Sequence, residues 1–356
     1  MARFFGCPEK ISVAMGVVAN GLACLALTIF VSCRDGGIPR NPINPNVKLL
    51  KSYFSDNPRG NFRIGVWSNN DVYCLAPLRK LTVGSEFKVI KDELIRDFRY
   101  SLEPIPGYGY RYVHFLAINK KGTKILMVMS LYGDISLGDL VEMDLQSHSI
   151  RVLRDSTYNV SSALYWQGDS TCIYYSFGNF TRGTSPGYYA YNLRSGEDNN
   201  IILFNSPGET NEVIEGFDIS PDGTKLLFPL NYARYPTLDE FNLVDHSIRI
   251  LDLKFDHIFL WARYSPDGKR ILYSNYSAGV GGSSTASGTE VGIVDMETMT
   301  KSVLDVNTNE YGSSVNVFPS WSPDGRAIIF GSAQGPEPTP SGAISPYSLY
   351  VLRNVQ

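Results

Sequence analysis

The sequence is poor in the residues that mark several common kinds of functional site. Its 356 residues include 32 Lys and Arg against 35 Asp and Glu, a net charge of −3, so it lacks the basic patch of a nucleic-acid-binding protein. Its four histidines and five cysteines show no spacing typical of zinc or haem. There is no G-x-S-x-G motif and no glycine-rich phosphate loop before a helix. We therefore expect no nucleic acid, metal or cofactor.

What the sequence does contain is a repeated turn, Ser-Pro-Asp-Gly, between two apolar runs. It occurs at residues 220–223, 265–268 and 322–325. Proline fits the second position of a β-turn, aspartate bonds to nearby backbone, and glycine accepts positive φ. One aspartate per turn gives no converging set of metal ligands. The motif therefore predicts structural hairpin turns at Asp222, Gly223, Asp267, Gly268, Asp324 and Gly325.

Weaker copies of this turn extend the repeat toward the N-terminus. They end at Gly60, Gly122 and Gly168, which gives six turns about 53 residues apart on average. In each repeat an apolar run follows the turn, as expected for a strand buried on both faces. A third and a fourth run complete each repeat, and we assign residues 71–77 as the third run of the first repeat. Four antiparallel strands per repeat predict an all-β, six-bladed β-propeller with four-stranded blades.

The last blade lacks a fourth strand, because only three residues follow the run 348–353. The segment 38–49 is the available donor from the other end of the chain. Its three prolines disfavour a central strand and permit an outer one, so the sequence leaves this closure open. Cys74 and Cys172 are assigned to non-adjacent blades, to the third strand of blade one and the second strand of blade three. We expect both to be buried and unpaired.

The repeat resembles that of the TolB-like propellers, which carry a WD40-like (PD40) repeat with a Trp-Ser-Pro-Asp-Gly turn. Residues 321–325 match that turn fully, and the resemblance covers residues 47–356, with weaker matches in blades one to three. TolB itself has an α/β domain before its propeller, for which this sequence offers no room. Similar repeats occur in sugar-active enzymes and in prolyl-oligopeptidase-type peptidases. The resemblance thus implies a fold rather than a function.

The N-terminal residues resemble a bacterial lipoprotein signal. Residues 1–32 form the predicted signal peptide, with an apolar run at 11–31, and Cys33 would be the lipidated residue. The alternative is an uncleaved helical membrane anchor, because the run is long enough to span a bilayer. Residues 33–46 are then a spacer, and residues 47–356 are the propeller. Either reading predicts a propeller tethered to a membrane of the bacterial cell envelope, outside the cytoplasm.

The predicted loops differ between the two faces of the propeller. Connections between second and third strands (177–186, 232–239, 278–289, 333–346) and two inter-blade segments (93–110, 205–214) are long and share one face. Rigid scaffolds carry function on such loops, and tyrosine suits recognition. We therefore expect a binding face that includes Tyr108, Tyr110, Tyr188, Tyr232, Tyr235, Tyr276, Tyr311 and Tyr347.

Polar residues on or near the innermost strands suggest a second site at the mouth of a central channel. They are Arg111, His114, Glu215, Asp218, Asp256, His257 and Arg263. His148 and His246 occupy equivalent places in the short outer hairpins and are expected to be structural. No converging catalytic set emerges, so the sequence favours a binding role over an enzyme. The preferred partner is a cell-envelope protein, held by the long-loop face. The alternative is a carbohydrate, bound or cleaved at the channel mouth.

Overall fold

The computed structural model describes the chain from residue 43 onward, with gaps. The described ranges are 43–51, 65–75, 78–96, 111–131, 138–179, 183–204, 216–232, 235–253, 255, 259–276, 289–308, 314–334 and 347–355. The predicted signal segment and Cys33 lie outside them. Within these ranges no helix is long and apolar enough to cross a membrane. The chain divides into two units, Met1–Pro39 and Arg40–Gln356, and every described residue belongs to the second.

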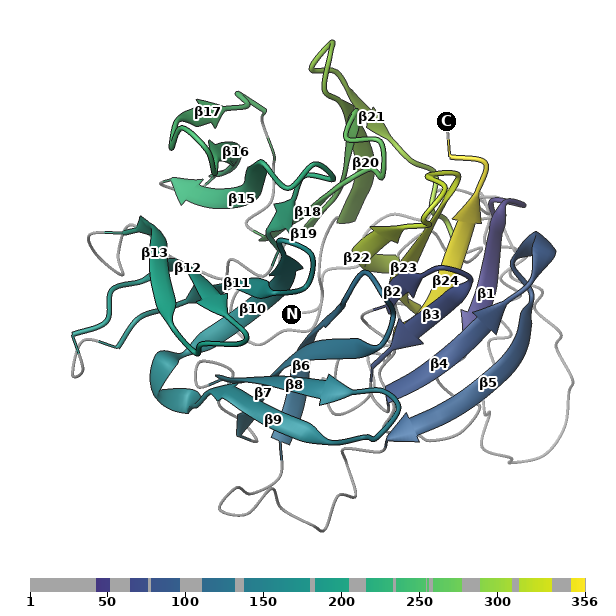
Figure 1. The fold of residues 1–356 in the computed structure, drawn as a ribbon. Coiled ribbons are helices and arrows are strands. Elements are labelled where there is room, and N and C mark those ends of the chain that lie inside the picture. Colours follow the sequence, from purple (N-terminus) through teal and green to yellow (C-terminus); the bar gives the residue numbers. More distant parts are fainter. Residues whose placement is uncertain are drawn as a thin grey trace, which may run out of the picture. The chain divides into compact units, whose positions relative to one another are not determined.

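The described residues form six antiparallel sheets of four strands each (Figure 1). Blades one to three consist of β2 (Gly65–Ser68), β3 (Asp71–Cys74), β4 (Leu78–Val83) and β5 (Val89–Arg96); β6 (Arg111–Ile118), β7 (Lys124–Leu131), β8 (Gly138–Asp144) and β9 (Ile150–Arg154); and β10 (Val160–Trp166), β11 (Thr171–Ser176), β12 (Gly187–Asn192) and β13 (Asp198–Leu203). Blades four to six consist of β14 (Asp218–Ile219), β15 (Lys225–Tyr232), β16 (Tyr235–Asn242) and β17 (Ile248–Ile250); β18 (Phe259–Tyr264), β19 (Arg270–Tyr276), β20 (Thr289–Asp295) and β21 (Lys301–Val303); and β22 (Ser314–Trp321), β23 (Ala327–Gln334), β24 (Tyr347–Arg353) and β1 (Val47–Lys51). Two short 3₁₀ turns, η2 (Ser85–Phe87) and η3 (Ser156–Tyr158), complete the described elements.

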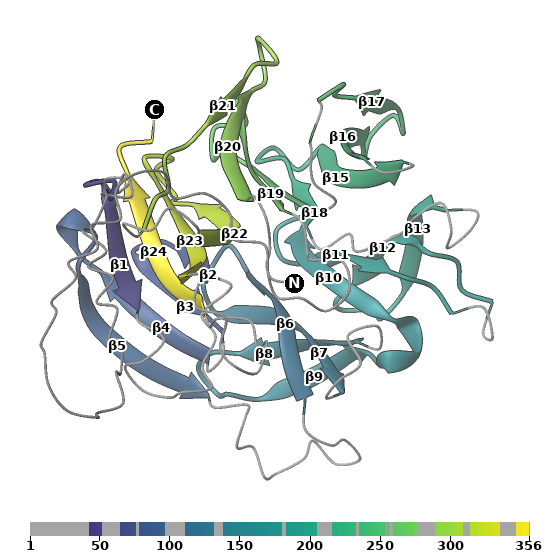
Figure 2. The ribbon, with the colours of Figure 1, turned by 180° about the vertical axis from the view of Figure 1, so that it is seen from behind.

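The six sheets close into a ring. The first strand of each blade contacts that of the next, in the order β2, β6, β10, β14, β18, β22 and back to β2. The two opposite views show these strands around the axis and the fourth strands at the rim (Figures 1 and 2). The second strands are buried on both faces, as their apolar sequences predict; β11 is buried throughout. The predicted six-bladed β-propeller is therefore confirmed.

The ring is closed by the N-terminal strand of the propeller. β1 pairs antiparallel with β24, with Val47 opposite Leu352 and Leu49 opposite Tyr350. The strand begins two residues after Pro45, so the prolines of the predicted donor segment do not enter the ladder. The closure that the sequence left open is thus made, with β1 as the outer strand of blade six.

The Ser-Pro-Asp-Gly turns have the structural role that their sequence predicts. The amides of Gly223, Gly268 and Gly325 donate to the carbonyl oxygens of the turn serines at 2.8–2.9 Å, and these glycines have φ of 75°, 71° and 70°. In each turn the serine hydroxyl donates to the aspartate at 2.6 Å. These bonds lower the pKa of all three carboxyl groups. The aspartates therefore hold the turns rather than a ligand.

Blade one departs from the predicted assignment by one strand. Its first two strands are joined by a two-residue turn at Asn69 and Asn70, so residues 71–74 form the second strand rather than the third. The turn assigned near Gly60 lies outside the described residues. Cys74 is accordingly in a second strand, like Cys172 in β11. Both thiols are free and buried, and burial raises the pKa of each to about 12.

One predicted long loop is wrong. Residues 232–239 were expected to form an irregular connection, but β15 and β16 stay paired as far as Tyr232 opposite Tyr235. The predicted segment 93–110 begins inside β5, which extends to Arg96. Within the segment 177–186, Asn179 and Thr184 form an isolated bridge. The inner parts of the other long connections lie outside the described residues.

The closure can be tested by a pair of neighbouring leucines in β1. Leu50 is 8% exposed and packs among residues of blades one and six, whereas Leu49 is 52% exposed. Leu50→Ala should lower the free energy of unfolding by about 2–4 kcal/mol, because it leaves a cavity in a packed core. Leu49→Ala should change it by less than about 1 kcal/mol. Urea unfolding of both variants measures this, and equal effects would contradict the role of β1.

Candidate functional site: a groove between blades three and four

Two of the seven predicted channel residues have described side chains, and they form an ion pair. Arg263 Nη1 lies 3.6 Å from Asp218 Oδ1, and Asp218 also accepts a hydrogen bond from the Tyr264 amide at 2.8 Å. Arg263 donates to the Phe217 carbonyl as well. Burial raises the pKa of Asp218 and lowers that of Arg263. The described structure therefore joins these two residues to each other.

Aromatic side chains from three blades pack around this pair. The Trp261 ring lies 4.7 Å from Phe318 and 5.9 Å from Phe115, measured between centroids. The Arg263 guanidinium lies 4.4 Å from the Trp261 ring. All four side chains are buried. Arg263 is therefore mostly covered by packing, and its place at the channel mouth stays a prediction. Glu215, Asp256 and His257, and the side chains of Arg111 and His114, lie outside the description.

Of the eight tyrosines predicted to form a binding face, one has a described side chain, and it is buried. Tyr188 is fully buried between blades three and four, 5.2 Å from Phe217 and 5.4 Å from Phe228 between ring centroids, so its place on a binding face is wrong. The other seven tyrosines have no described side chain. Tyr232, Tyr235, Tyr276 and Tyr347 lie in strands, and Tyr108, Tyr110 and Tyr311 lie outside the described residues.

A repeated cluster of charged side chains seals two of the boundaries between blades. In blade two the buried Glu142 carboxylate lies 3.3 Å from Lys124 Nζ and 2.8 Å from Arg151 Nη2. It also accepts a hydrogen bond at 3.2 Å from Tyr165, which belongs to blade three. We call this arrangement a carboxylate clamp. It joins three strands of one blade to the first strand of the next.

Blade four repeats the clamp at the same register positions. Glu240 lies 3.7 Å from Lys225 and 3.2 Å from Arg249, and Tyr264 of blade five donates to it at 2.6 Å. Burial raises the pKa of Tyr264, and the neighbouring Glu240 carboxylate raises it further, so the hydroxyl stays a donor.

Blade one carries the same three positions with the charges reversed. Asp71, Lys80 and Glu93 replace the Lys, Glu and Arg of the clamp, and Lys80 lies 2.9 Å from Asp71. In blades five and six the central position is filled instead by buried aliphatic side chains, Ile293 and Val351.

Blade three has neither charges nor bulk at these positions. The ladder places Thr171, Ala190 and Asn199 where blade two has Lys124, Glu142 and Arg151. The tyrosine of the following blade is replaced by Ile219. The carboxylate clamp is thus absent at the boundary between blades three and four.

A second inter-blade contact is absent from the same boundary. Between blades two and three, Arg154 Nη2 lies 2.5 Å from Asp198 Oδ2, and its guanidinium lies 4.1 Å from the Tyr191 ring. The register equivalents one blade further on are Ile202 in place of Arg154 and Ile248 in place of Asp198. Neither isoleucine can form an ion pair.

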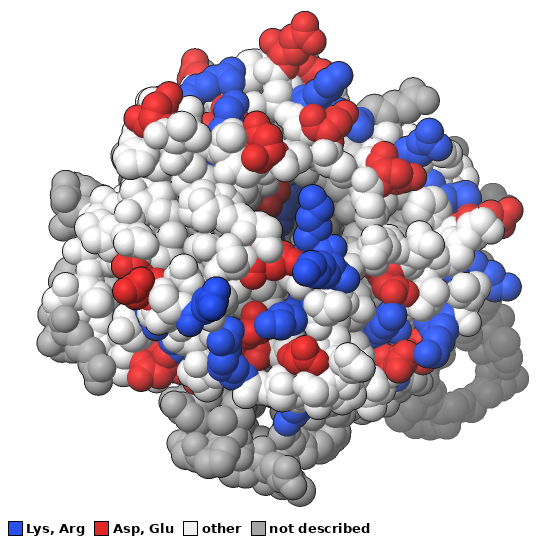
Figure 3. Space-filling model, in the orientation of Figure 1, with Lys and Arg blue, Asp and Glu red and all other residues white. Residues whose placement is uncertain are grey.

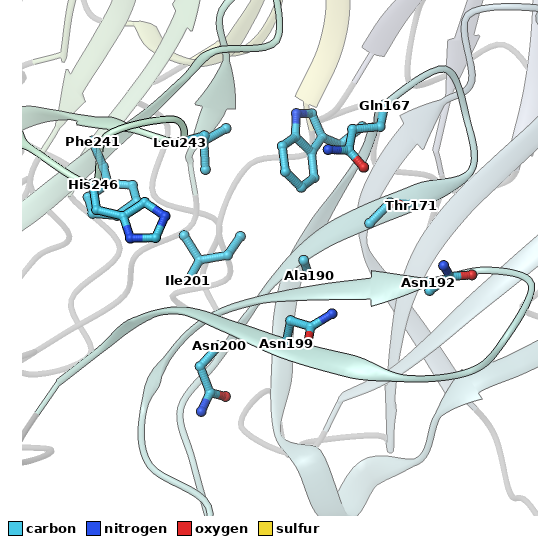
Figure 4. A pocket seen from close by; sticks show the side chains of 11 residues that line it. Gln167, Thr171, Ala190, Asn192, Asn199, Asn200, Ile201, Phe241, Leu243 and His246 are labelled. Carbon is cyan, nitrogen blue, oxygen red and sulfur yellow. The ribbon is translucent and has the colours of Figure 1, made fainter.

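A groove of about 320 Å³ opens where these contacts are missing (Figure 4). It is lined by Trp166, Gln167, Thr171, Ala190, Asn192, Asn199, Asn200, Ile201, Phe241, Leu243 and His246. We call it the inter-blade groove. Figure 4 shows His246 and Phe241 on one side of the groove, with Ile201 of β13 beside them. The sequence patterns did not predict this site, because aligning Ala190 with Glu142 across the repeats requires the strand register that the structure provides.

The lining of the groove is rich in carboxamides and carries no Asp, Glu, Lys or Arg. Two aromatic groups support it: the His246 ring stacks on Phe241 at 5.8 Å, and Trp166 Nε1 donates to the Gly223 carbonyl at 2.9 Å. His246 sits in the outer hairpin that the sequence predicts, with φ of 63°, as does His148 with 58°. Besides its structural place in the hairpin, His246 therefore also lines the groove, where its ring stacks on Phe241.

Aliphatic residues of blade four lie just outside the lining of the groove. Ile248 pairs with Phe241 in the ladder, so both side chains point toward blade three, and Ile250 follows on the same face. Ile248 is 57% exposed, Ile250 66% and the nearby Val244 75%. These side chains remain in water because blade three does not reach them. They define an aliphatic edge beside the groove.

No group of three or more His, Cys, Asp or Glu in the described part of the chain is close enough to hold a metal ion. On the face shown in Figure 3, positive and negative side chains are intermixed.

The fold can now be compared with known proteins. No protein-family model matches the sequence, and no curated protein matches it either. Among solved structures, TolB from Acinetobacter baumannii is similar, with a TM-score of 0.51 and 14% identity over 79% of this chain. The alignment covers 61% of that TolB chain, less than two thirds of its length.

Two further structures show the range of proteins with this fold. A family AA12 carbohydrate-active enzyme from Trichoderma reesei has a TM-score of 0.57 at 12% identity, covering 89% of this chain and 98% of the other. A chain of a nidogen/laminin complex has a TM-score of 0.51 at 9% identity, covering 78% of this chain and 96% of the other. At these identities the likeness establishes the fold alone. The protein is a six-bladed β-propeller whose fold is similar to that of TolB, and its function must be argued from its own residues.

Asp239 gives the same boundary a testable pH dependence. Its buried carboxylate faces blade three, Oδ1 has no partner among the described residues, and burial raises its pKa to about 6. Because the folded state holds the proton more tightly than the unfolded chain, this group lowers the free energy of unfolding as pH rises from about 4 to about 6. Asp239→Asn should therefore gain stability relative to the wild type across that interval.

Urea unfolding at about pH 4 and about pH 7.5 measures the difference between the two proteins. Asp245→Asn is the control, because the exposed Asp245 has a lowered pKa and should show the opposite trend. A stability difference between the wild type and Asp239→Asn that does not change with pH would contradict the account of Asp239.

Proposed function

We propose that this protein is a membrane-tethered binding propeller that holds another protein of the bacterial cell envelope, outside the cytoplasm. The observation that carries the proposal is the aliphatic edge of blade four, Val244, Ile248 and Ile250, beside the inter-blade groove. Large apolar side chains exposed together on an edge strand are expected at a protein-binding surface.

Two further observations support a partner at the rim. The described residues around Arg263 and Trp261 are packed against one another, so these two side chains offer little free surface to a carbohydrate at the channel mouth. The nidogen/laminin likeness is an example of the same fold within a protein complex. The predicted lipoprotein signal and the likeness to a TolB support the location in the cell envelope.

Binding at the aliphatic edge can be tested by photocrosslinking in the bacterium that encodes the full-length chain. A photoreactive residue at Val244 or Ile250 should capture one discrete envelope protein, while the same residue at the exposed Lys121, in a blade-two turn, should not. Ile248→Asp should abolish the capture without loss of stability, because that side chain is largely exposed. Equal capture from Lys121, or none from either edge position, would contradict the proposal.

The tether is tested separately by metabolic labelling with a fatty-acid analogue. The wild-type chain should incorporate the label and fractionate with membranes, and Cys33→Ser should abolish the label, because the thioether at this cysteine carries the lipid. A membrane-bound wild type of full length and without label would instead support the uncleaved helical anchor.

A further inference from the structure

The inter-blade groove has features that define the chemistry of what enters it. We propose that it binds an extended peptide segment of the partner, with an uncharged, apolar side chain inserted between blades three and four. This inference rests on the proposed function and deepens it by naming the recognised element.

The absence of charge in the lining selects against charged occupants. A lysine or aspartate side chain entering the groove would lose hydration and find no countercharge among the lining residues. At the equivalent places in blades two and four, Lys, Glu and Arg already satisfy one another. The groove therefore lacks the charged cluster of blades two and four, and it can accept an uncharged ligand.

The two walls suit the two parts of a peptide. Gln167 and Asn199 carry carboxamides, which both donate and accept hydrogen bonds and so match the amide and carbonyl groups of a main chain. β13 is the outermost strand of its blade, with its outer edge unpaired in the described sheet, and offers backbone groups for strand addition.

The opposite wall suits an apolar side chain. Phe241 and Leu243 of blade four line the groove on this side, and Ile248 continues this surface outward. At about 320 Å³ the groove is near the lower end of ligand sites, which run from about 300 to about 1,000 Å³. It is suited to one or two inserted side chains, with the rest of the segment lying along the aliphatic edge.

A variant that closes the groove can be made by copying the clamp residues of blades two and four into blade three. Thr171→Lys, Ala190→Glu and Asn199→Arg, with Ile219→Tyr, rebuild the carboxylate clamp of blades two and four. The single substitution Asn199→Arg is a second variant that leaves the core unchanged, because Asn199 is exposed. The matched control is Ser302→Arg, which introduces the same arginine at the equivalent exposed position of blade five.

The probe is an array of synthetic decapeptides of Gly, Ser and Thr with a single varied central residue, incubated with the detergent-solubilised full-length protein. Peptides centred on Leu, Ile or Phe should bind, and those centred on Asp or Lys should bind about tenfold more weakly or less. The clamp variant and Asn199→Arg should each lose about tenfold or more in binding, whereas Ser302→Arg should bind as the wild type does.

Three results would overturn the proposal. They are no binding of any peptide, equal binding of charged and apolar peptides, and unchanged binding by Asn199→Arg. Binding of a neutral oligosaccharide array that is lost in Asn199→Arg would instead assign the groove to a saccharide.

Crosslinking from Val244 and Ile250 in the Asn199→Arg background separates this proposal from the proposed function. If Asn199→Arg loses binding to the peptide array but still captures the envelope protein, the proposed function holds and the groove does not bind that partner. If the wild type captures nothing, the proposed function falls.

Discussion

Two of the boundaries between blades depend on a buried carboxylate that both neighbouring blades contact. A propeller must seal six faces between twisted sheets, and burying a lone charge there would be costly. Blades two and four resolve this by surrounding Glu142 and Glu240 with a lysine and an arginine of the same blade and a tyrosine of the next. Because the tyrosine comes from the following blade, the same contact that satisfies the charge also fixes the spacing between blades.

This constraint explains why the groove lies where it does. Ala190 is the smallest residue at the central clamp position, which holds Lys80, Glu142, Glu240, Ile293 and Val351 in the other blades. Without charge or bulk, blades three and four stay in contact through their inner halves, where Tyr188 packs against Phe217 and Phe228. Their outer halves leave the groove and the aliphatic edge. The groove and the aliphatic edge thus exist because the clamp residues of blades two and four are missing at the boundary between blades three and four.

Much of the fold could be predicted from the sequence because the turns have their own local chemistry. Asp324 and its equivalents bond within four residues, so the motif specifies the hairpin whatever surrounds it. Blade one was misassigned because its turn at Asn69 and Asn70 lacks that motif. The tyrosine face failed at Tyr188 because strand propensity and recognition use the same residue type, and only the ladder decides which way a side chain points. The groove could not be predicted from the sequence, because only the strand register of the structure aligns Ala190 with Glu142 across the blades.

The most direct test of this account is the accessibility of the central clamp position in different blades. Ala190→Cys and Ile293→Cys place a thiol at the same register position, one at the groove and one in a sealed boundary. Their rates of reaction with N-ethylmaleimide can be compared in the folded full-length protein by mass spectrometry of the modified peptides, which separates these positions from Cys7, Cys24 and Cys33. The native Cys74 and Cys172 are buried. The account predicts that the thiol at position 190 reacts about tenfold faster or more, because a reagent reaches it without opening of the fold. Equal rates at the two positions would contradict it.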